Sequence, residues 1–377
     1  MIGDAFRRSL SPDVPRKNSM SLTGALRLLS AFIFVSLSGI AHAAATEVTL
    51  GEPARTTLTF GPIFAAMELG YFAQEGIELK ILEFQGTSIL LPQIANKSVM
   101  IGFVNADPLI LSRQPGRDSI PVKFFYNGAR ASIWEFAVPV GSPVKSLDDL
   151  RNKTIGVGAL ANGNVPIIKA MLKERGLVLG KDYSFMATGD GPLAFRATLN
   201  GDVAAYNAND VFVAAFAQMT KIRRLQVPDK FRNLFSNGFV THESTIKEKP
   251  ELLAGFGRAL TKGVLVCEAN PDFCVRNFWK LNPSLKPVVD SDAQLLANGR
   301  QMLDARMAKY LSFSPGAARR FGAFEEHAWH DYVDILFEGE ELSTKDIDVS
   351  TLYTNELVDR FNDFDVGKIQ SFAKTLK

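Results

Sequence analysis

Hydrophobic and polar positions alternate in two successive blocks between residues 46 and 227. The first block predicts strands over 48–54, 77–84 and 99–105, helices over 62–69 and 88–97, and extended runs over 122–126 and 135–140. The second predicts strands over 154–158, 183–187, 203–207 and 222–227, with helices over 164–176, 192–199 and 210–219. Alternating strands and helices are typical of a parallel sheet with helices on its faces, so two blocks predict an α/β fold with two lobes.

The chain from about residue 250 to its end is largely helical in pattern. Within the second block, Asn164 is expected to cap the helix that follows it, and in the first block Asp107 is expected to cap a short helix. No internal repeat of fixed period is present.

The first 43 residues have the order of a secretory signal. Five basic side chains precede an apolar run over 28–37, and the segment closes on Ala41-His42-Ala43. The apolar run is shorter than the ~20 residues that a membrane-spanning helix needs. We therefore expect a cleaved signal peptide over 1–43 and a periplasmic mature protein, translated from Met1 or from Met20.

Removing residues 1–43 lowers Lys+Arg from 42 to 37 and Asp+Glu from 40 to 38, so the mature chain is close to neutral. A near-neutral chain argues against nucleic acid as a partner, because such binding needs a concentrated basic surface. With 46% hydrophobic residues, the mature chain can fill the cores of two domains.

The two cysteines, Cys267 and Cys274, leave two alternatives open. In one unbroken helix they would lie ~10 Å apart by rise alone, which is too far for a disulfide. Because Asn270-Pro271 lies between them, a helix–turn–helix can instead bring the sulfurs together in an oxidising compartment. Buried free thiols are the other alternative.

Loops that follow predicted strands carry the candidate binding residues, because ligands of α/β sheets bind at the carboxyl ends of strands. Their hydroxyls, amides and free helix N-termini suit anions and polar groups, although the same residue types are also ordinary in turns and caps. In the first block the candidates are Arg55, Thr57, Phe60, Gly61, Gln85, Gly86, Thr87, Asn105 and Asp107. In the second block they are Asn162, Gly163, Asn164, Asp190, Asn207, Asn209 and Asp210.

Trp134 lies between the two blocks, where it can stack on a planar ligand or pack in the core. Arg55 is the one cation among the candidate loops, and Arg130 is a further cation near the hinge. An arginine beside hydroxyls fits a small acid group, while Trp134 and Phe60 fit an organic body. The loop residues thus favour a small organic acid as the ligand.

Signs of catalysis are weak. The candidate loops hold no histidine, cysteine or lysine, and no nucleophile elbow, phosphate loop or Cys-x-x-Cys occurs. His327-x-x-His330 has metal-like helical spacing, but its aromatic neighbours favour a half-exposed helix. We therefore expect no enzyme activity, no cofactor and no metal.

Several motifs resemble a known family of solute receptors. They are residues 69–79 (LGYFAQEGIEL), 146–157 (SLDDLRNKTIGV), 189–194 (GDGPLA), 199–205 (LNGDVAA), and 353–357 (YTNEL) with 362–365 (NDFD). In this order they resemble the periplasmic solute-binding proteins of ABC importers for nitrate, sulfonates, taurine and thiamine pyrimidine precursors. One departure is Ala204, where the family usually has aspartate.

The resemblance implies a type II periplasmic-binding fold with a discontinuous first lobe over 44–130 and 240–377 and a second lobe over 131–239. It also implies a monomer that binds a small-molecule solute and works with the permease and ATPase subunits of an importer. Among the ligands of this family, the loop residues favour an organic acid over bare nitrate, with a thiamine-type pyrimidine second. Two rivals remain: a pyrimidine-synthase-like enzyme on the same fold, which would need a histidine in a pocket loop, and a ligand-sensing receptor not coupled to transport.

Overall fold

The computed structural model describes residues 45–289 and 291–377, so the predicted signal peptide lies outside the described residues. Among the helices of these two ranges, none combines the length and the apolar character needed to cross a bilayer.

The first sheet has five strands in the order β2–β1–β3–β10–β4. These are β1 (Thr46–Glu52), β2 (Ile77–Glu83), β3 (Ile101–Val104), β4 (Val122–Asn127) and β10 (Gly238–His242). β1 pairs in parallel with β2 and β3, whereas β10 runs antiparallel to β3 and β4. The first sheet is therefore completed by a strand that follows the whole second block in sequence.

The second sheet repeats this design in the order β7–β6–β8–β5–β9. Its strands are β5 (Trp134–Pro139), β6 (Lys153–Val157), β7 (Tyr183–Ala187), β8 (Ala205–Asn209) and β9 (Ile222–Arg224). β6 pairs in parallel with β7 and β8, and β5 is antiparallel to β8 and β9. Each sheet and its helices are called the first and second lobe below.

The chain passes between the sheets twice, through residues 128–133 and back through 225–237, a segment that includes α8 (Asp229–Arg232). The lobe limits expected from the sequence, 130/131 and 239/240, lie in the first of these segments and in β10. They stay a prediction.

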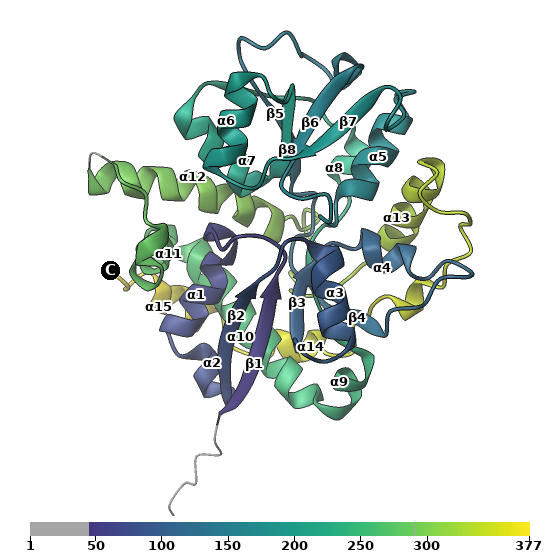
Figure 1. The fold of residues 1–377 in the computed structure, drawn as a ribbon. Helices are drawn as coiled ribbons and strands as arrows, with labels where there is room; N and C mark the ends of the chain where they lie inside the picture. Colours follow the sequence, from purple (N-terminus) through teal and green to yellow (C-terminus); the bar gives the residue numbers. More distant parts are fainter. Residues whose placement is uncertain (1–44, 290) are drawn as a thin grey trace, which may run out of the picture. The chain divides into compact units, whose positions relative to one another are not determined.

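Helices flank both sheets (Figure 1). Up to residue 219 they are α1 (Gly61–Glu68), α2 (Tyr71–Gln74), α3 (Thr87–Ala95), α4 (Asp107–Leu111), α5 (Val165–Lys173), α6 (Pro192–Asn200) and α7 (Asp210–Met219). After β10 they are α9 (Glu243–Glu248), α10 (Pro250–Ala269), α11 (Pro271–Leu281), α12 (Asp292–Tyr310), α13 (Glu326–Glu338), α14 (Val358–Phe361) and α15 (Val366–Ala373). The helical pattern predicted after residue 250 is confirmed.

Two of these late helices also contact the second lobe. Gln218 of α7 donates from Nε2 to the carbonyl of Asn298 in α12 at 2.9 Å. Lys169 of α5 forms an ion pair with Glu341, just after α13, at 2.7 Å. The C-terminal region therefore touches both lobes, where the sequence indicated only the first.

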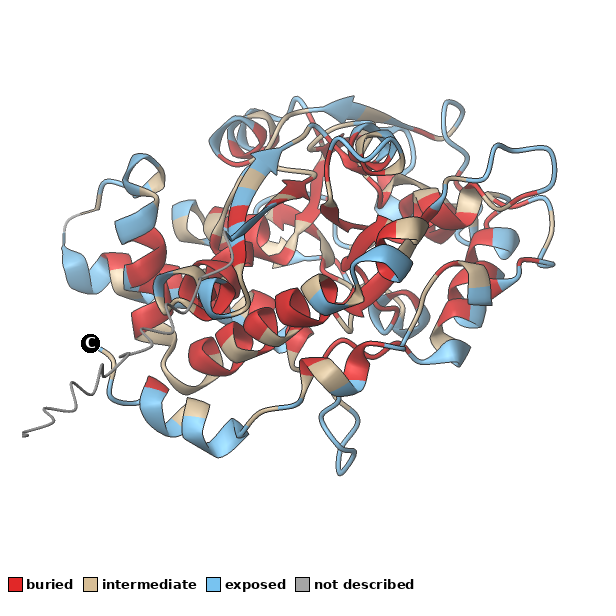
Figure 2. Cartoon of the chain, turned by 90° about the horizontal axis from the view of Figure 1, so that it is seen from below, coloured by how far each residue is buried: buried red, intermediate tan, exposed pale blue. Residues whose placement is uncertain are grey.

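The first-lobe core is rich in phenylalanine. Phe256 of α10 has its ring 5.3 Å from Phe239 of β10 and 5.5 Å from Phe72 of α2, measured between centroids. Helix α10 can approach α1 closely because residue 263 is glycine: a Cβ there would lie 2.1 Å from the carbonyl oxygen of Pro62. Buried residues follow the sheets and the inward faces of their helices (Figure 2).

Several predicted limits are confirmed to the residue, including those of β7 and α7. Strand β8 begins at Ala205, two residues later than predicted. The reason lies in the end of α6, where the amides of Asp202 and Val203 both bond to the carbonyl of Ala197. Gly201, at φ +83°, allows this turn, and the strand starts only after it.

Cys267 and Cys274 form a disulfide, with their Cα atoms 5.5 Å apart. Helix α10 ends at Ala269 and α11 begins at Pro271, so the chain turns at Asn270. Asn270 accepts from the amide of Phe273 and caps α11. Of the two alternatives left by the sequence, the structure has the helix–turn–helix.

Candidate functional site

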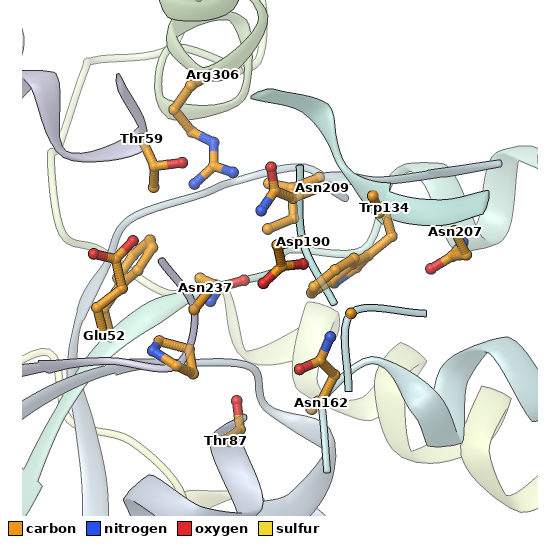
Figure 3. A pocket seen from close by; sticks show the side chains of 17 residues that line it. Glu52, Thr59, Thr87, Trp134, Asn162, Asp190, Asn207, Asn209, Asn237 and Arg306 are labelled. Carbon is orange, nitrogen blue, oxygen red and sulfur yellow. The ribbon is translucent and has the colours of Figure 1, made fainter. Parts of the chain in front are cut away.

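A central cavity of about 40 Å³ lies between the lobes. It is lined by Glu52, Pro53, Ala54, Thr59, Thr87, Phe103, Ile133, Trp134, Gly158, Asn162, Gly163, Asp190, Asn207, Ala208, Asn209, Asn237 and Arg306. These side chains converge from strand ends and loops of both sheets and from α12 (Figure 3). No histidine, cysteine or lysine is among the lining residues.

Two aromatic side chains contribute to the cavity wall. Trp134 is the first residue of β5 and is half-buried, and its Nε1 donates to Oδ1 of Asn105 at 3.1 Å. Phe103, at the end of β3, is buried against Phe60 and Phe239, with centroid distances of 5.6 and 4.7 Å. A hydrogen bond to Asn105 thus fixes the indole of Trp134, whereas packing against two phenylalanines fixes the ring of Phe103.

Two carboxyl groups face the cavity without a bonded cation. Burial raises the pKa of Glu52, at the end of β1, well above its usual value, although Thr56 donates to this carboxyl at 3.1 Å. Burial also raises the pKa of Asp190 to about 6, against the opposing effects of the Tyr206 hydroxyl and the Arg55 guanidinium. Burial therefore shifts Glu52 toward its neutral acid form, while Asp190 is mostly ionised at neutral pH.

Arg306 of α12 is the cation of the cavity, and it is fully buried. Its Nη2 and Nε donate to Asp210, the first residue of α7, at 2.6 and 3.1 Å. Nη1 is buried without a hydrogen-bond partner. The charge of Arg306 is therefore neutralised by a carboxylate of the second lobe, and its Nη1 NH₂ group remains unpaired.

The lobes also touch directly near α3 and α5. The amide of Ser88 donates to the carbonyl of Ala161 at 3.2 Å. Gly163 lies so close to the first lobe that a Cβ on it would come within 2.6 Å of Asn105 and 2.8 Å of Thr87. Contacts of this kind account for the small volume of the cavity.

Seven of the residues predicted from sequence line the cavity: Thr87, Trp134, Asn162, Gly163, Asp190, Asn207 and Asn209. Four more lie one step behind it. Asn105 bonds to Trp134, and Asp107 bonds to Asn105. Asn164 donates to Asn207 at 2.9 Å, and Asp210 pairs with Arg306.

The remaining predicted residues do not line the cavity. Arg55 and Gln85 are exposed, while Phe60 and Gly61 are buried in the first lobe. Thr57 accepts from the amide of Thr59 and caps a short 3₁₀ turn. Gly86 has φ +111° and lies against the carbonyl of Ala161.

Arg130, the second cation considered from sequence, is also placed elsewhere. It donates to the carbonyl of Ala323 at 3.0 Å and lies over the ring of Phe313. Neither arginine chosen from the sequence therefore meets the cavity, because one remains in solvent and the other binds within the first lobe.

The sequence predicted the wrong hydrogen-bond partners for both helix-capping residues, Asp107 and Asn164. Asp107 does not cap α4; instead its Oδ1 accepts from the amide of Ile167 in α5, at 3.0 Å. Asn164 makes no cap bond to its own helix. Because Pro166 has no N–H, the amide of Ile167 is the donor of the first turn that needs a cap, and a residue of the other lobe supplies it.

Sequence reasoning missed Arg306, Asn237, Glu52, Thr59 and Phe103, which all line the cavity. Glu52 and Phe103 had a signal, since each lies two residues before the end of a predicted strand. Arg306 had none: it lies in the last third of a 19-residue helix whose sequence gives no sign of a binding role.

The fold and the cavity define a class of protein. The structure has two five-stranded sheets with a cavity between them, and one strand in each sheet, β10 or β5, runs antiparallel to its neighbours. This is the type II periplasmic-binding fold of solute-binding proteins. Residues 57–273 match the family described as NMT1/THI5 like. The chain belongs to this family.

A curated relative is the riboflavin-binding protein RibY of Chloroflexus aurantiacus, 25% identical over 315 residues, which cover 83% of this chain and 86% of the relative. The alkanesulfonate-binding protein SsuA of Xanthomonas axonopodis pv. citri shares the fold at a TM-score of 0.62 and 13% identity, over 83% of this chain and all of SsuA. The nitrate-binding protein NrtA of Synechocystis PCC 6803 does so at 0.58 and 11% identity, over 88% and 99%.

One structural neighbour is an enzyme. The desulfurization enzyme DSZB aligns at a TM-score of 0.51 and 13% identity, over 84% of this chain and 99% of the enzyme. The fold by itself therefore does not separate receptor from enzyme.

Proposed function

We propose that this protein is the periplasmic solute-binding component of an ABC importer, and that it captures an uncharged, planar nitrogen heterocycle of the flavin or pyrimidine type. The lobes open to admit the solute, close on it by hinge motion, and deliver it unchanged to the permease. The protein acts as a monomer, exported through the signal segment at its start.

The charge of the cavity is the observation that carries this proposal. Arg306 is neutralised by Asp210, while Asp190 is mostly ionised at neutral pH and Glu52 favours the neutral acid. The lining thus has a slight excess of negative charge, which disfavours a sulfonate or nitrate anion. This replaces the acidic ligand that Arg55 suggested, because Arg55 is exposed.

The rest of the lining suits a flat ring with polar edges. Trp134 and Phe103 offer aromatic surfaces, and the amides of Asn162, Asn209 and Asn237 offer both donors and acceptors. The RibY relative is a riboflavin-binding protein, which supports the same class of solute.

A receptor is favoured over an enzyme by what lines the cavity. A transport receptor releases its ligand unchanged, so its site needs complementary hydrogen bonds and no activated nucleophile. The lining residues, all within the described ranges, include no histidine, cysteine or lysine.

A small organic acid is the second candidate, because Nη1 of Arg306 is buried without a partner and can bind a carboxylate or sulfonate oxygen. The two candidates make opposite predictions about competing probes. They also differ in pH dependence, since protonation of Asp190 favours an anion.

The test is calorimetric titration of the mature protein with riboflavin, a 4-aminopyrimidine, an alkanesulfonate and nitrate. We expect binding of riboflavin or the pyrimidine, a rise of several degrees in melting temperature, and recovery of the unchanged compound. Tighter binding of the sulfonate would select the second candidate. Product formed in excess of protein would contradict the receptor function.

A further inference from the structure

We propose that Asp107 is a positioning residue that joins closure of the two lobes to the orientation of Trp134 at the cavity. Asp107 belongs to α4 of the first lobe and does not line the cavity itself. Its two carboxylate oxygens face two different parts of the molecule, and the contacts of each are described in turn.

Oδ1 of Asp107 reaches the second lobe. It accepts from the amide of Ile167 at 3.0 Å and so caps helix α5. Asn164, the residue in the N-cap position, leaves this amide without a bond from its own side chain. When the lobes separate, the first turn of α5 loses this side-chain cap, and such caps stabilise the helix that they begin.

Oδ2 of Asp107 reaches toward the cavity. It accepts from Nδ2 of Asn105 at 2.6 Å and from the hydroxyl of Tyr332 at 2.6 Å. Because Asp107 binds the NH₂ group of Asn105, the amide oxygen of Asn105 must point the other way. That oxygen accepts from Nε1 of Trp134 at 3.1 Å and from the hydroxyl of Ser236 at 3.1 Å.

One buried carboxylate therefore fixes three parts of the site. It caps a second-lobe helix, it sets the orientation of a first-lobe amide, and through that amide it holds the indole that begins β5. Asp107 and Asn105 are both almost fully buried, so water does not replace these bonds while the lobes are closed.

The test measures lobe separation without any ligand, so its outcome is independent of the proposed function. Spin labels are attached at Leu82→Cys on β2 and Met186→Cys on β7, both exposed and on the sheet edges farthest from the crossing segments. The native cysteines are paired in the disulfide and do not take label. Pulsed electron paramagnetic resonance then gives the distance distribution between the lobes.

We expect Asp107→Ala to shift this distribution to longer distances by several ångströms, because both functions of the carboxylate are lost. Tyr332→Phe is the matched control: it removes a bond to the same carboxylate but leaves the bonds to Ile167 and Asn105. We expect this variant to lower the melting temperature while keeping the parent distances.

The Trp134 emission, taken as the difference from the corresponding Trp134→Phe protein, tests the second function. Asp107→Asn can still cap Ile167 through its amide oxygen but places an NH₂ group against that of Asn105. We expect Asp107→Asn to keep the parent distance between the spin labels and to shift the Trp134 emission to the red. Ser236→Ala, which spares the Trp134 bond, should leave both signals unchanged.

The proposal would be overturned if Asp107→Ala kept the parent distances between the spin labels. It would also be overturned if the distances in both Asp107→Ala and Tyr332→Phe lengthened in step with the loss of melting temperature. An unshifted Trp134 emission in Asp107→Asn would overturn the connection to the cavity.

Discussion

Two seams join the lobes, one where α7 meets α12 and one where α4 meets α5 (Figure 1), and their chemistry differs. In the α7–α12 seam, Asp210 forms a buried ion pair with Arg306. In the α4–α5 seam, Asp107 is equally buried but has only hydrogen-bond donors around it: an amide, a hydroxyl and a carboxamide. Each aspartate is the first residue of a helix in its own lobe. Asp107 binds across the seam to α5, and Asp210 binds across the seam to α12.

The difference shows what a cation contributes. Without one, burial dominates at Asp107 and raises its pKa to about 7, although Tyr332 and Asn105 oppose the rise. The α4–α5 seam is therefore sensitive to pH and to small changes of shape. The α7–α12 seam has full charge compensation, so we expect it to fail if either partner is removed.

Breaking the α7–α12 seam should have the largest effect. Asp210→Asn leaves the Arg306 guanidinium buried without a counter-charge, and we expect a loss of about 3–5 kcal/mol in the free energy of unfolding, measured with urea. Asp359→Asn, which breaks an exposed ion pair with Arg320, is the control and should cost less than about 1 kcal/mol. Equal losses in both variants would mean that burial does not distinguish the two pairs.

Changing pH should act on the α4–α5 seam and on Asp190. Their folded-state pKa values, about 7 and about 6, lie above the ordinary value of 3.8. The stability gained from protonation is therefore full below about pH 4 and is lost as pH rises to about 7, by a few kcal/mol for each group. Urea unfolding across this range measures it.

Two variants assign this pH dependence. Asp107→Asn should flatten the stability profile mainly near pH 7, and Asp190→Asn mainly near pH 6. If neither substitution changes the slope, these two carboxyls are not the groups that titrate.

A methyl group added at the α4–α5 seam should impair closure without harming either lobe. Gly163→Ala places a Cβ within 2.6 Å of Asn105 and 2.8 Å of Thr87 across the seam. We expect roughly tenfold weaker solute binding by calorimetry, at an almost unchanged melting temperature. Gly141→Ala, where nothing lies within 4 Å of the new Cβ, is the control. An unaltered affinity of Gly163→Ala would show that the α4–α5 seam adjusts to the added methyl group without impairing closure.

Glu52 lies between the seams, and its substitution should have the smallest effect. Because burial favours the neutral acid, Glu52→Gln keeps both shape and charge, and the glutamine oxygen can still accept from Thr56. We expect a change of less than about 1 kcal/mol in unfolding free energy at pH 7. A loss several times larger would indicate that Glu52 is ionised.

The sequence by itself determined the α/β class, the two blocks and most element limits, because hydrophobic period and turn residues are local properties. It also indicated seven cavity residues, which lie near the carboxyl ends of strands or, for Trp134, at the start of β5, since parallel strands present their carboxyl ends at one edge. For Trp134, the sequence left stacking on a ligand and packing in the core both open.

Only the tertiary structure decided which charges meet the cavity. Arg55 and Arg306 are alike as residues, yet one is exposed and the other lies in the cavity wall, because α12 returns to the site 96 residues after Asp210, the partner of Arg306. The partners of Asp107 and Asn164 changed for the same reason. A cap or an ion pair joins whichever groups the packed helices bring together, and sequence separation does not reveal that.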